Sequence, residues 1–245
     1  MSAAYWRVSR APRYSLLFAL PLLLAYQILA ALEPTGPRGS LRNGADVILE
    51  SLFVALAGRW GPLVFMTCVI GAGLWLVARD MQAHSGRLRA VVFVWMLAEA
   101  AALAAVFGVV VGGLASQVTS PPAPAAVMGA SQIETLRSGT RVMLSLGAGI
   151  YEELLFRVVL VTALAWLAEG VFGWSTTLAG GWAVLLGAIV FSTVHYLGPY
   201  GDQLTVYSFI FRMIAGLFFS ALYLLRGFGI TAWTHALYDV FLLVT

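Results

Sequence analysis

Long apolar runs separated by short polar segments dominate the sequence. A membrane-spanning helix needs about 20 mostly apolar residues. Seven segments reach or approach this length: Leu16–Leu32, Pro62–Ala78, Val91–Ala115, Val142–Ala168, Leu178–Leu197, Leu204–Leu225 and Phe228–Thr245. An eighth apolar stretch, Ala45–Ala57, is short and carries two acids at helical spacing. It predicts an interfacial or re-entrant helix, with a tilted eighth span as the alternative.

The composition agrees with this pattern. Hydrophobic residues make up 61% of the chain and charged residues 10%, whereas a soluble domain holds about 25% charged residues. We therefore predict an all-α polytopic membrane protein, a bundle of about seven to eight transmembrane helices with a buried polar cavity. The net charge of +3 is small and scattered, so we expect the lipid bilayer and no nucleic acid as a partner. A single cysteine, Cys68, excludes an internal disulfide and a cysteine-based zinc site.

Arginines predict the orientation of the spans. All fourteen basic residues are arginine, and cytoplasmic loops collect such residues. Six of them flank the first span or lie between the next two spans: Arg7, Arg10, Arg13, Arg79, Arg87 and Arg89. We expect an uncleaved first span, a cytoplasmic N-terminus and a location in a bacterial plasma (inner) membrane. The proline-containing loop Ser116–Thr140 then lies outside, although Arg137 and Arg141 do not follow the rule.

Ionisable side chains within the apolar runs are the candidate functional residues. A charge at the centre of a spanning helix costs about 2.5–3.5 kcal/mol on insertion scales, so such a residue is expected to have a function. The first half of the chain offers only Glu99, to which we assign no role. The second half holds Glu152, Glu153, Arg157, His195, Arg212, His235 and Asp239. We expect Arg212 to pair with a carboxylate.

Helical spacing separates the two adjacent glutamates. Glu153 and Arg157 are four residues apart, with the acid first, which favours an ion pair. Glu152 lies about 100° further around the helix and does not share that partner. One carboxylate is then neutralised and the other stays free, which is what acid–base chemistry needs. His235 and Asp239 are also four residues apart and share a face.

Two kinds of site fit these side chains if they converge in one pocket. One is a general base that activates water, with donors that hold the oxyanion of a tetrahedral intermediate. The other is a divalent metal such as zinc, with His195, His235, Asp239 and Glu152 as candidate ligands. The sequence leaves both open, and no cofactor is certain.

Three motifs in this order resemble one family. They are EExxxR at Glu152–Arg157, FxxxH at Phe191–His195 and HxxxN/D at His235–Asp239. Each lies on its own apolar run, and together they resemble the CPBP family of intramembrane proteases, which includes Rce1-type CAAX prenyl endopeptidases and bacterial Abi proteins. The resemblance predicts a catalytic core at 140–245 and a variable region of N-terminal transmembrane spans at 1–139.

The resemblance implies an intramembrane endopeptidase. Glu152 would activate water with His195 as its partner, and His235 and Asp239 would line the oxyanion side. Glu153 and Arg157 would form a structural ion pair. Family members have been described both as metalloproteases and as glutamate-dependent enzymes, so the mechanism stays open.

Asp239 is a departure from the CAAX-processing members, which have Asn there. Ionised Asp only accepts hydrogen bonds. Asp239 is therefore protonated, orients His235 or ligates a metal. Convergence of the site also requires shifted helix ends, because Glu152 lies about 15 Å into its predicted span.

The expected substrate is a membrane-associated peptide or protein. Prenylated CAAX proteins are the eukaryotic substrate class of the family, and in bacteria we expect bacteriocin precursors, peptide signals or membrane anchors. The main alternative is a catalytically silent homologue that acts as a membrane scaffold or a bacteriocin-immunity-type binding protein. A proton-coupled carrier is a third hypothesis, which no internal repeat supports.

Overall fold

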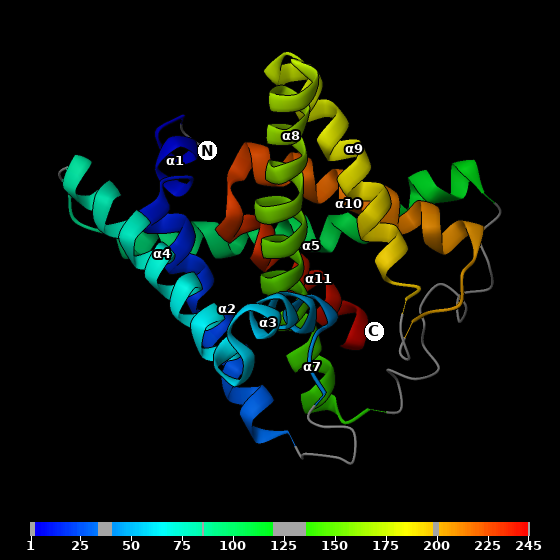
Figure 1. The fold of residues 1–245 in the computed structure, drawn as a ribbon, viewed down its shortest axis with the longest axis horizontal. Coiled ribbons are helices and arrows are strands. Elements are labelled where there is room, and N and C mark those ends of the chain that lie inside the picture. The colour runs from blue at the N-terminus through cyan, green and yellow to red at the C-terminus, as the bar shows by residue number, and fades with distance from the viewer. Residues whose placement is uncertain (1–2, 34–40, 85, 120–135, 198–200, 245) are drawn as a thin grey trace.

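All regular elements in the described part of the chain are helices (Figure 1). A computed structural model describes residues 3–33, 41–84, 86–119, 136–197 and 201–244. The helices are α1 (Ala3–Ser9), α2 (Pro12–Leu32), α3 (Gly44–Ala57), α4 (Gly61–Ala83), α5 (Ala90–Val118), α7 (Ser138–Gly147), α8 (Thr162–Phe172), α9 (Thr176–Val194), α10 (Val206–Arg226) and α11 (Phe228–Val244). Most of the loop expected at Ser116–Thr140 and the predicted end at Thr245 lie outside the described residues.

Among the described residues, six helical stretches are long and apolar enough to cross a membrane. The prediction of an all-helical polytopic membrane protein is therefore confirmed, and the chain is an integral membrane protein. These six do not include the last predicted span. The last predicted span, α11, has 17 residues and a length of about 25 Å, which is less than the roughly 30 Å of a bilayer core. It packs against α2, α5, α7 and α10.

The short apolar stretch before α4 forms a separate helix. At 14 residues, α3 is about 21 Å long and too short to cross a bilayer alone. A turn at Gly58–Trp60 follows, in which Gly58 has a φ of 55°. The chain then folds back so closely that a Cβ on Gly61 would lie 2.4 Å from the Val54 nitrogen. Glycine at this position is therefore what lets α3 pack beside α4.

The helix that carries the two glutamates is continuous from Ser138 to Phe172 and is locally widened. Ala148–Glu152 and Leu154–Val161 have π-helical hydrogen bonding and lie between α7 and α8. A π segment is rare and is often found at a functional site. A Cβ on Gly149 would lie 2.4 Å from the Ala232 carbonyl oxygen, so glycine allows α11 to pack directly on the widened turn.

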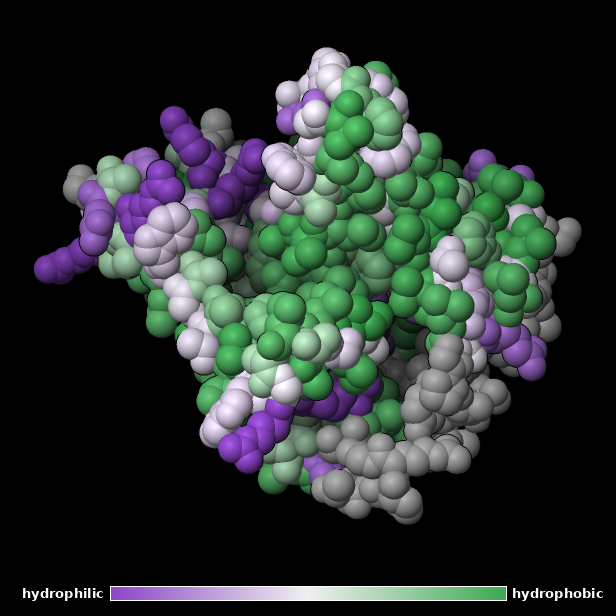
Figure 2. Space-filling view, viewed as in Figure 1, coloured by the Kyte–Doolittle hydropathy of each residue, from purple (hydrophilic) through white to green (hydrophobic). Residues whose placement is uncertain are grey.

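Charged residues gather at one end of the bundle. Buried Arg226 binds Glu99 through Nε and Nη2 at 2.6 and 2.7 Å, and its guanidinium lies 4.1 Å from the Trp6 ring centroid. Tyr5 also donates to Glu99. These contacts bind α1 to α5 and α10 and give Glu99 a structural partner. Figure 2 shows hydrophilic side chains over α1 and the C-terminal end of α4, and a broad apolar surface across the centre of the view.

Candidate active site

The two adjacent glutamates face different partners. Glu153 is fully buried, and its Oε2 lies 3.2 Å from Arg157 Nε. Glu152 accepts a hydrogen bond through Oε1 from Asn43 at 3.0 Å. Its Oε2 is buried, has no hydrogen-bond partner among the described residues and lies 3.8 Å from His195 Nε2. The predicted division between a paired and a free carboxylate is thus present in the geometry.

The orientation of His195 follows from its position at the end of α9. Its Nδ1 lies 2.7 Å from the Phe191 carbonyl oxygen, one helical turn earlier. A carbonyl only accepts, so Nδ1 carries the proton and neutral His195 presents the lone pair of Nε2 to Glu152. Two acceptors therefore face each other at 3.8 Å, a separation too long for a direct hydrogen bond. The ring of Phe191 packs edge-on against that of His195.

Arg157 and His235 complete the surroundings of Glu153. His235 Nδ1 lies 2.7 Å from Glu153 Oε1, and the ring of Phe219 stacks on the imidazole at a centroid distance of 4.4 Å. The guanidinium of Arg157 lies 4.5 Å from the Phe191 ring centroid. The carboxylate of Glu153 thus lies between His235, which binds Oε1, and Arg157, whose Nε faces Oε2 at 3.2 Å as an ion pair without a hydrogen bond.

Asp239 and Arg212 lie at the edge of this group. Asp239 Oδ2 is 3.7 Å from His235 Nε2, and its side chain is 29% exposed. Arg212 pairs with Asp202, as expected for a structural partner of a carboxylate, and also donates to Tyr196. Asp239 therefore lies beside His235 without a direct hydrogen bond to it, and none of its three predicted roles is singled out.

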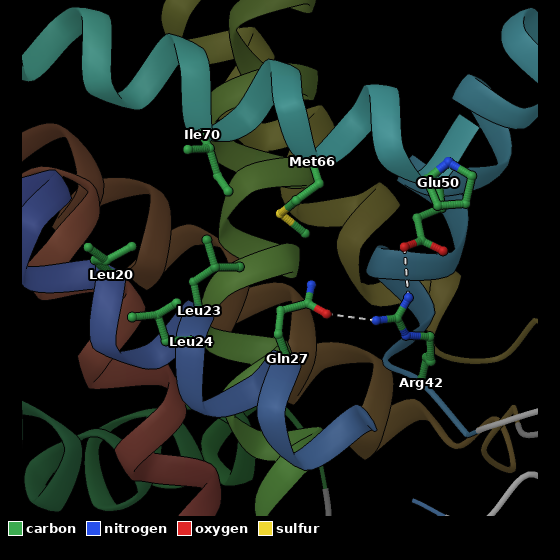
Figure 3. Close-up of a pocket in the computed structure, with 9 residues that line it drawn as sticks. Leu20, Leu23, Leu24, Gln27, Arg42, Glu50, Met66 and Ile70 are labelled. Carbon is green, nitrogen blue, oxygen red and sulfur yellow. Dashed lines mark hydrogen bonds and ion pairs between the residues drawn. The ribbon is translucent and has the colours of Figure 1, made fainter. Parts of the chain in front are cut away.

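Residues before α3 contribute to the site, and the sequence did not predict this. Asn43 caps α3 and reaches Glu152 across the fold. Its neighbour Arg42 binds Glu50 and Gln27, as Figure 3 shows, and its Nε lies 3.2 Å from Asp46. A pocket of about 410 Å³ lies beside these residues, between α2 and α4. The one sequence feature that pointed to this region was the pair of acids, Asp46 and Glu50, in the short apolar stretch Ala45–Ala57.

The four candidate metal ligands do not form a metal site as the structure arranges them. Among the described residues, no group of three or more His, Cys, Asp or Glu side chains could hold an ion. The Nδ1 atoms of His195 and His235 bind Phe191 and Glu153, and their Nε2 atoms face Glu152 and Asp239 at 3.8 and 3.7 Å. As arranged, the predicted set of His195, His235, Asp239 and Glu152 does not form a metal-binding group, and we derive no step through a metal.

The structure brings the six predicted site residues into one connected group. The expected difficulty of depth does not prevent this contact, because α9 ends at Val194 and His195 Nε2 lies 3.8 Å from Glu152 Oε2. His195 follows directly and faces the middle of the long helix. The residues are Glu152, Glu153, Arg157, His195, His235 and Asp239.

Comparison with known proteins agrees with this arrangement. Residues 138–241 match the family model described as type II CAAX prenyl endopeptidase Rce1-like. No curated protein and no solved structure matches the chain. The matched segment runs from α7 into α11 and includes all six predicted site residues. Residues 138–241 are thus similar to Rce1-like CAAX prenyl endopeptidases, which supports the resemblance of the motifs to the CPBP intramembrane proteases.

Proposed function

We propose that this protein is an intramembrane endopeptidase that hydrolyses a peptide bond with water activated by Glu152 and His195. The observation that carries the proposal is the pair of facing acceptors, Glu152 Oε2 and His195 Nε2, 3.8 Å apart. A water molecule has two protons and can donate one to each acceptor. Such a water would be oriented and polarised at the same time, as general-base catalysis requires.

The reaction follows from that geometry. Glu152 takes a proton from the water as its oxygen attacks the peptide carbonyl carbon, which forms a C–O bond and a tetrahedral oxyanion. Glu152 then gives the proton to the leaving nitrogen as the C–N bond breaks. The products are a carboxylic acid and an amine. Asn43 keeps Glu152 Oε1 occupied, so proton transfer falls to Oε2.

His235 is the candidate donor to the oxyanion. Its Nδ1–H donates to Glu153, because an ionised carboxylate can only accept. In the imidazolium form Nε2 donates as well, and this is the form that can stabilise an oxyanion. Asp239 lies 3.7 Å from that atom and would hold the ring in place. Glu153 and Arg157 would fix His235 without touching the substrate.

A membrane-anchored peptide is the proposed substrate, and residues 140–245 are the proposed catalytic core. We also propose that the N-terminus is cytoplasmic in a bacterial inner membrane, because the arginines near α1 lie at the same end of the bundle as the loop after α4. His195 follows the C-terminal end of α9, which lies away from the end of the bundle that holds α1 (Figure 1). His195 would then lie toward the outer side of the membrane. Access of a membrane-impermeant cysteine reagent to Thr193→Cys and His84→Cys variants tests this orientation.

The function is tested with purified protein in proteoliposomes and a set of membrane-anchored peptides, including a farnesylated CAAX peptide. Mass spectrometry should detect a product in which the new carboxyl group has taken one oxygen from ¹⁸O-labelled water. Glu152→Gln should yield far less product, and Glu169→Gln, on an exposed part of α8, should behave as wild type. Activity retained by Glu152→Gln would refute the assigned base. A binding role would be favoured if Glu152→Gln kept the biological effect.

A further inference from the structure

We infer that Asn43 is a positioning residue that sets which oxygen of Glu152 acts as the base. Asn43 lies at the start of α3, outside the segment that matches the family model. It is 7% exposed, and its side chain makes two directed contacts. The inference rests on the proposed function, because it concerns the carboxylate assigned as the base.

The hydrogen bonds of the Asn43 side chain fix its amide orientation. Oδ1 accepts from the backbone N–H of Ala45 at 2.9 Å, which is the N-cap contact of α3. Nδ2 must then be the atom that faces Glu152, and it donates to Oε1 at 3.0 Å. One amide group thus joins a helix cap to the carboxylate. With Oε1 held in this way, the free oxygen of Glu152 is the one beside His195.

Contacts around Asn43 leave it little freedom. Its backbone N–H donates to Tyr26, whose hydroxyl in turn donates to the fully buried carboxylate of Asp46. Arg42, the preceding residue, binds α2 through Gln27 and α3 through Glu50 (Figure 3). The segment before α3 is therefore clamped between two helices, and Asn43 cannot turn away from Glu152 without breaking these contacts.

Space for Asn43 comes from a glycine on the catalytic helix. A Cβ on Gly147 would lie 2.8 Å from the Asn43 Cβ and 2.6 Å from the Tyr26 ring. Real Cβ atoms do not approach other atoms so closely. Only glycine therefore lets the start of α3 come within hydrogen-bond distance of Glu152. The N-terminus of α3 also points its backbone dipole toward the carboxylate, which favours a negative charge there.

Two substitutions separate positioning from helix capping. Ser is as good an N-cap as Asn, but its hydroxyl lies too close to the backbone to reach Glu152. Asp is also a good N-cap, yet it has no hydrogen to donate and sets a second carboxylate against Glu152. Capping alone predicts that Asn43→Ser and Asn43→Asp match wild type. Positioning predicts a loss of kcat in Asn43→Ser and a larger loss in Asn43→Asp.

The experiment measures kcat, KM and thermal stability for wild type, Asn43→Ser, Asn43→Asp, Glu152→Gln and Glu169→Gln. The substrate is the membrane-anchored peptide that wild type cleaves fastest in proteoliposomes. We expect Asn43→Ser to keep KM and thermal stability while kcat falls about 10- to 100-fold, the worth of one hydrogen bond to a charged group. Asn43→Asp should fall further, and Glu169→Gln should match wild type.

The outcomes separate this inference from the proposed function. An inactive Glu152→Gln together with a fully active, stable Asn43→Ser would overturn the positioning role and leave Glu152 as the base. An Asn43→Asp variant that is at least as active as Asn43→Ser would also overturn it. An active Glu152→Gln would overturn the proposed function itself. A loss of stability in Asn43→Ser as large as its loss of kcat would also overturn the positioning role, because the lost activity would then follow from lost folding.

Discussion

Arg157→Met removes one partner of a buried ion pair and replaces it with an uncharged side chain of similar shape. Arg157 is 1% exposed and Glu153 is 0% exposed. At the 3.2 Å between Arg157 Nε and Glu153 Oε2, and with an effective dielectric constant near 20, Coulomb attraction is about 5 kcal/mol. Breaking such a pair leaves a buried charge without its partner, for which losses of about 3–5 kcal/mol are typical. We expect the free energy of unfolding to fall by that amount.

The same substitution at Arg212 is the matched control. Arg212 pairs with Asp202, and the two side chains are 17% and 18% exposed, so this pair is partly solvated. Arg212→Met should cost about 1 kcal/mol or less. The free energy of unfolding is measured by titration with SDS in mixed micelles, followed by tryptophan fluorescence and circular dichroism.

A double variant tests the cause of the loss. Glu153→Gln combined with Arg157→Met removes both charges, while the new amide oxygen can still accept from His235. This variant should be more stable than Arg157→Met alone, because no carboxylate is left buried without a partner. The reasoning is refuted if Arg157→Met costs no more than Arg212→Met, or if the double variant is as unstable as the sum of its single changes.

Three further substitutions test the packing around the site. Gly149→Ala should drive α11 from the π-helical turn and destabilise the protein by about 1–3 kcal/mol in the SDS titration, whereas Gly170→Ala, which has open space, should be neutral. Gly147→Ala should lower kcat in the peptide assay by displacing the start of α3, and Gly139→Ala on the same helix should leave kcat unchanged. Arg226→Met should remove the contacts of Arg226 with Glu99 and Trp6 and loosen α1, so that trypsin cuts the N-terminal segment faster than in wild type; equal rates would contradict that role.

Much of the site could be predicted from local spacing. Glu153 and Arg157 are on the same helix, so a four-residue separation was enough to predict their ion pair, and the structure has it at 3.2 Å. The expectation that Arg212 meets a carboxylate also holds, because an unpaired charge in a membrane is costly. Such predictions succeed in two cases. Either the two partners are on the same helix, or a charged residue in a bilayer must have a partner.

Contacts between distant segments could not be predicted in this way. Asn43 and Glu152 are 109 residues apart, and Asn before an apolar run looks like an ordinary helix cap. The π segments depend on the close approach of α11 at Gly149, which is a tertiary contact. The metal assignment stays a prediction for a related reason. Spacing shows which donors share a helix face but not how donors on different helices meet, and as arranged no group of three among the described residues could hold an ion.

The most direct test of the account is the kcat of Glu152→Gln measured together with its free energy of unfolding. The new side chain keeps an oxygen that can accept from Asn43, but its amide cannot take a proton from water. The account predicts that kcat falls by about 10²- to 10⁴-fold, while the variant stays at least as stable as wild type. Cleavage at the wild-type rate by a folded Glu152→Gln variant would contradict it.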